Sequence, residues 1–201
     1  MTANESPDNA ELKHRIRRVL SVIRSIAVHM SAHETDPRES ALHLAGRVGA
    51  IGRVAVTPVS GGIDLESLVL DELRVHGVNR ASIAVKGPAV RLNAKSAELM
   101  SLALHELATN AIKFGALSQS QTQLRVIWYF TGALNSRLRF EWAEYGVQLA
   151  PGARRNSGFG SDVVKRLIAS ELRGKGEMLF LDGGVLCTIE IPANEALLQN
   201  E

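Results

Sequence analysis

Five polar side chains that could bind a phosphate and its metal ion occur close together within residues 99–115. On a helix that turns roughly 100° per residue, they share one face: His105, Glu106, Thr109, Asn110 and Lys113. Leucine, methionine and alanine residues occupy the opposite face, as expected of a helix that packs on a sheet. Glutamate and asparagine supply oxygens, which Mg²⁺ accepts beside phosphates and water. A solvated amphipathic helix is the alternative, and the pattern alone favours it.

The order of the letters, however, resembles a known motif. Residues 105–118, HELATNAIKFGALS, resemble the N-box of the HWE histidine kinases. That family is also named for a Trp-x-Glu, which Trp142-Ala143-Glu144 resembles. The resemblance covers nearly the whole chain and implies a Bergerat-fold domain, in which Mg-ATP lies between this helix and an open sheet.

The resemblance implies a role for each polar residue of the helix. Asn110 and Glu106 would ligate Mg²⁺. Glu106 would hold a metal-bound water or act as the base. His105 would touch phosphate, and Lys113 would add positive charge. Phosphoryl transfer needs mainly alignment and charge neutralisation, which this set can provide.

Two further segments resemble the rest of an ATP site. By resemblance, Glu144 at the end of a predicted strand accepts a hydrogen bond from the adenine amino group, and Gly146 lets the backbone approach the ring. The other segment precedes a predicted helix, whose free N–H groups favour an anion. Its expected phosphate-binding residues are Gly158, Gly160 and Ser161.

A histidine of the predicted first helix is the candidate phosphoacceptor. Residues 11–16, ELKHRI, resemble the phosphoacceptor box of the family, whose usual form has asparagines in place of Lys13 and Arg18. His14 lies opposite the apolar seam of the helix and should therefore be exposed. Neutral imidazole is a good nucleophile. By resemblance the catalytic residues are thus His14 and Glu106, whereas Arg18 puts phosphatase activity in doubt. The remaining histidines lack matching context and are predicted to be surface residues: His29, His33, His43 and His76.

Two domains are predicted, residues 1–59 and 60–201, with the boundary at the Ser60-Gly61-Gly62 linker. In the first, a heptad seam predicts a helix from about Asp8 to His33, and Asp36-Pro37 begins a second helix that must end before Pro58. This hairpin buries little alone, so it should form a four-helix bundle in a homodimer, or else fold back on the second domain in a monomer. The second domain is predicted to be an α+β sandwich with helices on one face of a sheet, and Trp142 is predicted to be a core residue.

Composition narrows the cellular setting of the protein. No signal-peptide pattern and no apolar run of about 20 residues is present, so we expect a cytoplasmic protein that does not enter the membrane. The only cysteine, Cys187, excludes a disulfide framework. A net charge of +2 is too small to indicate nucleic acid as a partner. The basic residues of the first helix, Lys13 to Arg24, are by default a solvated face.

The sequence therefore predicts a histidine kinase of two-component signalling. It would use ATP and Mg²⁺ to phosphorylate His14 and pass the phosphoryl group to the receiver domain of a response regulator. Sensing would belong to a separate sensor protein or to a longer chain. One alternative is a histidine phosphotransfer relay protein with a degenerate ATP-binding domain, and another is an ATP-dependent protein that inhibits a regulator by docking.

Overall fold

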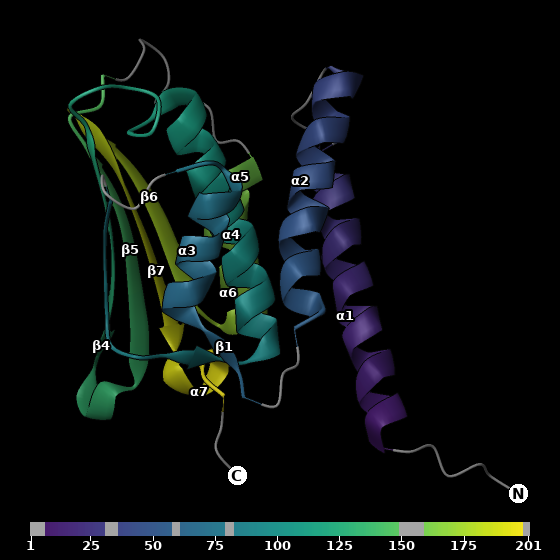
Figure 1. Cartoon of the computed structure of the whole chain (residues 1–201). Helices are drawn as coiled ribbons and strands as arrows, with labels where there is room; N and C mark the ends of the chain where they lie inside the picture. Colours follow the sequence, from purple (N-terminus) through teal and green to yellow (C-terminus); the bar gives the residue numbers. More distant parts are fainter. Residues whose placement is uncertain (1–6, 31–35, 58–60, 79–82, 149–158, 199–201) are drawn as a thin grey trace, which may run out of the picture.

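The protein forms a mixed sheet, a layer of helices on one face of that sheet, and a helical hairpin beyond that layer (Figure 1). The structure is a computed structural model that describes residues 7–30, 36–57, 61–78, 83–148 and 159–198. This is the predicted α+β class, with N-terminal helices followed by a sheet and its helices. No described helix is long and apolar enough to cross a membrane.

The hairpin consists of helices α1 (Pro7–Met30) and α2 (Pro37–Ala55). As predicted, Asp36 caps α2, and its side chain accepts a hydrogen bond from the Arg38 N–H. Ile26 is fully buried. The N-terminal part of the predicted seam is not covered, since Leu12 and Ile16 are 55% and 49% exposed.

One arginine of the supposed solvated face has a different role. The Arg15 guanidinium donates hydrogen bonds to the main-chain oxygens of Val54 and Thr57, at 3.1 and 3.0 Å, and so ties α1 to the end of α2. The prediction that this residue is merely solvated is therefore wrong.

The main sheet has five strands in the order β2-β4-β5-β7-β6, with β2 parallel to β4 and the other neighbours antiparallel. Its strands are β2 (Ile83–Lys86), β4 (Gln123–Thr131), β5 (Arg137–Tyr145), β6 (Lys175–Leu181) and β7 (Gly184–Pro192). Along β4 and β5 the residues alternate in burial, because one face of the sheet meets the helices and the other meets solvent. Trp142 and Cys187 face each other across β5 and β7 and are fully buried in the core.

Two short strands lie outside this sheet. Strands β1 (Ile63–Asp64) and β3 (Arg91–Leu92) pair with each other in an antiparallel ribbon. Strands β2 and β3 flank the Gly87-Pro88 turn, but they belong to different sheets.

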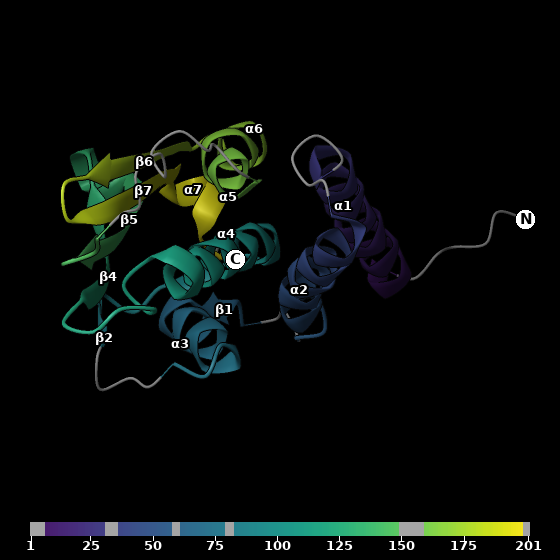
Figure 2. The ribbon, with the colours of Figure 1, turned by 90° about the horizontal axis from the view of Figure 1, so that it is seen from above.

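Helix α4 (Ala94–Phe114), which carries the residues of the N-box, is the central helix of the layer. In Figure 2 it lies between α3 (Leu65–Val75) on one side and α5 (Phe159–Asp162) with α6 (Ile168–Leu172) on the other, and α2 packs along its outer side. A π-helical turn (Val163–Leu167) joins α5 to α6, and a short C-terminal helix, α7 (Ala193–Ala196), follows β7. Because α4 has neighbours on nearly every side, all of residues 96–108 are buried.

Candidate functional site

The C-terminal half of α4 contacts the start of α5, where predicted phosphate-binding residues lie. Gly160, in the first turn of α5, lies so close to α4 that an added Cβ would be 2.9 Å from the Cβ of Glu106 and 3.3 Å from Nδ2 of Asn110. Only a residue without a side chain allows this approach. The structure thus brings Gly160 to Glu106 and Asn110, two predicted site residues that lie about fifty positions before it in the sequence.

Glu106 forms a buried ion pair with an arginine of the hairpin. The Nε of Arg47 lies 2.8 Å from Oε1 of Glu106, and its Nη2 lies 3.3 Å from Oε2. The same guanidinium stacks on the Phe159 ring, 3.9 Å from the ring centroid. Since Arg47 and Glu106 are only 4% and 8% exposed, the alternative of a solvated polar face does not hold for Glu106.

His105 is also turned toward other helices. Its Nδ1 lies 2.7 Å from Oε1 of Glu72 in α3. Its other nitrogen lies against α2, where a Cβ on Gly46 would come within 2.6 Å of Nε2. Gly46 therefore permits the close contact between α2 and α4, and His105 is a buried interhelical residue in this arrangement.

Asn110 and Lys113 lie further along α4, and both are exposed. The amine of Lys113 lies 2.6 Å from Nε2 of His43 and 3.5 Å from a carboxylate oxygen of Glu39, both in α2. Of the predicted metal ligands, Asn110 is thus the one whose side chain reaches the surface. Glu106 and Asn110 offer carboxylate and amide oxygens, a donor set that fits Mg²⁺.

The Trp-x-Glu residues form a hydrogen-bonded unit at the C-terminal end of α4. The Glu144 carboxylate accepts hydrogen bonds from the Ala116 N–H at 2.7 Å and from the Trp142 indole N–H at 2.9 Å. Burial raises the pKa of Glu144, and these two donors only partly offset that effect. Gly115 has room only for hydrogen, because an added Cβ would overlap Glu144. Trp142 is a core residue, as predicted, and it also orients this carboxylate.

The other predicted site residues are placed as follows. Gly146 follows β5 with a φ of 74°, a conformation that favours glycine, and Ser161 is buried in α5. Gly158 and the side chain of His14 lie outside the described part of the chain, although the backbone of His14 belongs to α1.

Three residues near α4 were not predicted to be site residues, although the sequence places each of them suggestively. Arg47 lies three residues after Leu44 and four before Ile51, so it shares the side of α2 that carries these apolar residues. Glu72 and His76 are four residues apart, so they share a face at the end of α3. The prediction that His76 is a surface residue is wrong, because its side chain is only 18% exposed and lies 3.3 Å from Glu72.

The fold and this arrangement are those of a helical hairpin followed by the ATP-binding domain of a histidine kinase, and comparison with known proteins agrees. A model of the family described as HWE histidine kinase matches residues 11–89. A blue-light-activated histidine kinase of Rhizobium johnstonii is 31% identical over 186 residues, which cover 91% of this chain and 52% of the relative. One from Erythrobacter litoralis is 31% identical over 195 residues, covering 92% and 53%.

The solved histidine kinase domain of an Erythrobacter litoralis blue-light-activated kinase has the same fold, with a TM-score of 0.62 at 18% identity over 92% of this chain and 91% of that one. The chain belongs to the HWE histidine kinase family. It spans about half the length of the curated relatives that it matches.

Proposed function

We propose that the protein catalyses Mg-ATP-dependent phosphorylation of His14 and then transfers the phosphoryl group to an aspartate of a response-regulator receiver domain. The observation that carries this proposal is the contact of Gly160 with Glu106 and Asn110. It sets the N-terminal N–H groups of one helix beside a carboxylate and an amide of another. Together these groups could meet a phosphate chain and its cation.

In this proposal Asn110 and Glu106 hold Mg²⁺, which neutralises charge on the phosphates when it is bound. Gly160 and Ser161 offer backbone N–H groups to the phosphates, together with Gly158. Lys113 adds positive charge once it leaves His43. Glu106 would hold a water of the metal or accept the proton of His14, and both roles require a carboxylate free of Arg47.

The adenine would lie just beyond the C-terminal end of α4, next to Glu144. Each oxygen of Glu144 accepts one hydrogen bond from the protein and retains a second lone pair for an amino group. Gly146 lets the backbone come close to the ring. The Ala116 and Trp142 donors hold the carboxylate in place before the nucleotide arrives, so little ordering is needed on binding.

The Arg47–Glu106 pair implies that the hairpin must move for catalysis. While α2 packs against α4, the Arg47 guanidinium is paired with the Glu106 carboxylate, which the metal would need as a ligand. Release of α2 would free Glu106 and, through α1, reposition His14. The described arrangement is then a resting state.

We also propose that two chains associate through α1. Three of its apolar side chains, spaced four residues apart, lie on one side of the helix, and all are about half or more exposed: Leu12, Ile16 and Leu20. A stripe of this kind indicates a surface that another helix covers. Light scattering should show a dimer at micromolar concentration. A monomer would instead favour the hairpin folded back on the second domain, and the packing of α2 on α4 is consistent with that form.

A relay protein is the second candidate, because His105 and Glu106 make structural contacts to Glu72 and Arg47. Asn110→Asp separates the two functions. Loss of hydrogen bonds to charged groups should cost roughly 1.5–3 kcal/mol, or about ten- to a hundredfold in affinity, and the added negative charge increases that loss.

A kinase should therefore lose labelling from ATP in Asn110→Asp, while His14 still accepts phosphate from a phosphorylated regulator. Asn135→Asp, at the exposed turn between β4 and β5, makes the same chemical change away from the site and should label normally. If the wild type never labels from ATP and exchanges phosphate with a regulator as fast as Asn110→Asp does, the protein is a relay.

A further inference from the structure

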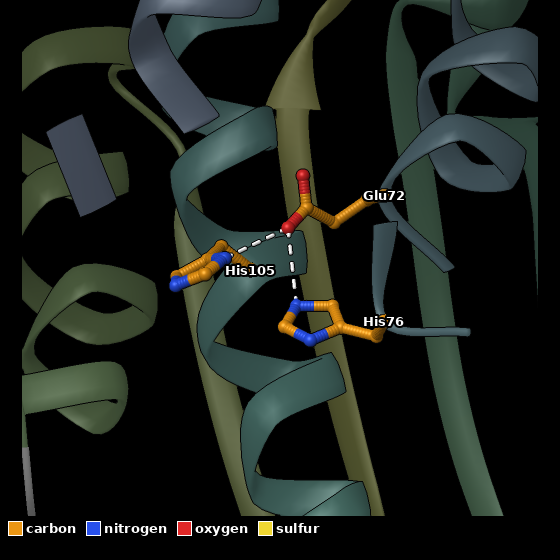
Figure 3. A group of neighbouring side chains, drawn as sticks. All are labelled: Glu72, His76 and His105. Atoms are coloured by element: carbon orange, nitrogen blue, oxygen red, sulfur yellow. Dashed lines mark hydrogen bonds and ion pairs between the residues drawn. The ribbon is translucent and has the colours of Figure 1, made fainter. Parts of the chain in front are cut away.

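Three side chains at the junction of α3 and α4 form a compact group of metal-ligand type (Figure 3). Oε1 of Glu72 lies 2.7 Å from Nδ1 of His105 and 3.3 Å from Nε2 of His76. One potential ligand atom from each residue lies within 4.8 Å of the other two. The group includes no residue proposed to bind Mg²⁺, although it shares His105 with the N-box.

The group has an unsatisfied position. Nε2 of His76 is buried and has no hydrogen-bond partner, because its approach to Glu72 lacks hydrogen-bond geometry. A buried ring nitrogen without a partner has lost its hydrogen bonds to water and gained none within the protein. Figure 3 shows both rings turned toward the same carboxylate oxygen, and a cation between them would satisfy all three groups at once.

The helices hold these residues in place. Glu72 and His76 are four residues apart at the end of α3, so they project from one face, and His105 approaches from α4. Burial tends to raise the pKa of Glu72, but the interactions with His105, His76 and Arg53 outweigh that effect and lower the pKa to about 2. The ion pair with Arg53 favours the ionised carboxylate, which is the form that a metal ligand must have. Arg53 binds its other oxygen and leaves Oε1 to the histidines.

We propose that Glu72, His76 and His105 form a binding site for Zn²⁺ or a similar divalent transition metal. Two imidazoles and one carboxylate suit this class of ion, whereas Mg²⁺ prefers oxygen ligands. In a tetrahedral zinc site, neighbouring ligand atoms are about 3.3 Å apart, given ligand bonds of about 2.0 Å. The pair formed by Glu72 and His76 already has that separation, and the pair formed by Glu72 and His105 must open by only about half an ångström.

An occupied site would join α3 to α4 and keep His105 turned away from the phosphates. It would leave a fourth position for water, since three ligands come from the protein. The proposal does not depend on the proposed kinase activity, because metal binding is measured without ATP. Failure of one therefore leaves the other standing.

The test is a titration of the chelator-treated full chain with Zn²⁺, followed by calorimetry. We expect one equivalent to bind and His76→Gln to weaken binding at least tenfold, since even outer partners of metal ligands change affinity by roughly ten- to a hundredfold. The matched control replaces two other histidines that are four residues apart, His29→Gln with His33→Gln, and should keep the affinity. Loss of binding in this control with retention in His76→Gln would overturn the proposal, as would absence of binding in the wild type.

NMR of the histidine rings in the wild type needs no substitution and covers the case in which His76→Gln does not fold. Zn²⁺ should shift the ring signals of His76 and His105 together, at one equivalent, and leave those of His29 and His33 unchanged. Shifts confined to His29 and His33 would contradict the assignment.

Discussion

The buried pair of Arg47 and Glu106 makes a quantitative prediction about how the hairpin is held on the ATP-binding domain. Both side chains are almost fully buried, and the two contacts at 2.8 and 3.3 Å form a bidentate pair. Removing one partner of such a pair typically costs roughly 3–5 kcal/mol, because the other charge is left buried and unpaired. In Arg47→Met, loss of the contact with Phe159 adds about 0.5–2 kcal/mol.

A double-mutant cycle with Arg47→Met and Glu106→Gln measures this interaction. In urea unfolding, the double variant should be more stable than the sum of the single losses indicates, by about 1–3 kcal/mol. The matched control is the exposed pair Arg74 and Asp71, for which Arg74→Met and Asp71→Asn should give a coupling below about 1 kcal/mol. Equal couplings for the two pairs would refute the reasoning that α2 is locked onto α4 through Glu106.

Three further predictions concern the sheet side of α4. Glu144→Gln should destabilise the protein by roughly 1–3 kcal/mol, because its amide nitrogen must face either the Ala116 or the Trp142 donor. Thermal unfolding followed by tryptophan fluorescence measures this loss, and an unchanged midpoint would contradict it. Burial raises the pKa of Glu144, so the folded state holds a proton that the unfolded state releases. The free energy of unfolding should therefore fall as pH rises above the ordinary glutamate pKa. This dependence of stability on pH should disappear in Glu144→Gln. Burial, together with the charge of Glu144, raises the pKa of Cys187 to about 12. A thiol reagent at pH 8 should therefore react with Cys187 only after the protein unfolds. Fast labelling of the native protein would contradict this, because it would show that this part of the core is open.

Local features of the sequence predicted much of the architecture. Asp36 caps α2 as expected, and Asp64 caps α3 in the same way, because an N-cap depends on residues within one turn. Alternating burial along β4 and β5 follows from a period of two, and that is also local. The meeting of Gly160 with Glu106 and Asn110 followed from resemblance to the family, not from periodicity.

The packing of α2 on α4 could not be predicted from such patterns. The face with His105 and Glu106 has the polar character of a solvated surface, and only the approach of Arg47 and Glu72 from other helices makes its burial possible. Charges of opposite sign compensate across helices that are far apart in the sequence, and a period within one helix does not reveal that. The same reason explains why His76 was expected at the surface.

The most direct test of the proposed activity is incubation of the full chain with γ-labelled ATP and Mg²⁺, with the label followed through acid and base treatment. We expect an acid-labile, base-stable label that is absent from His14→Gln and retained in His29→Gln, which changes another histidine of the same helix. The same label in His14→Gln, or an acid-stable label in the wild type, would contradict phosphorylation of His14.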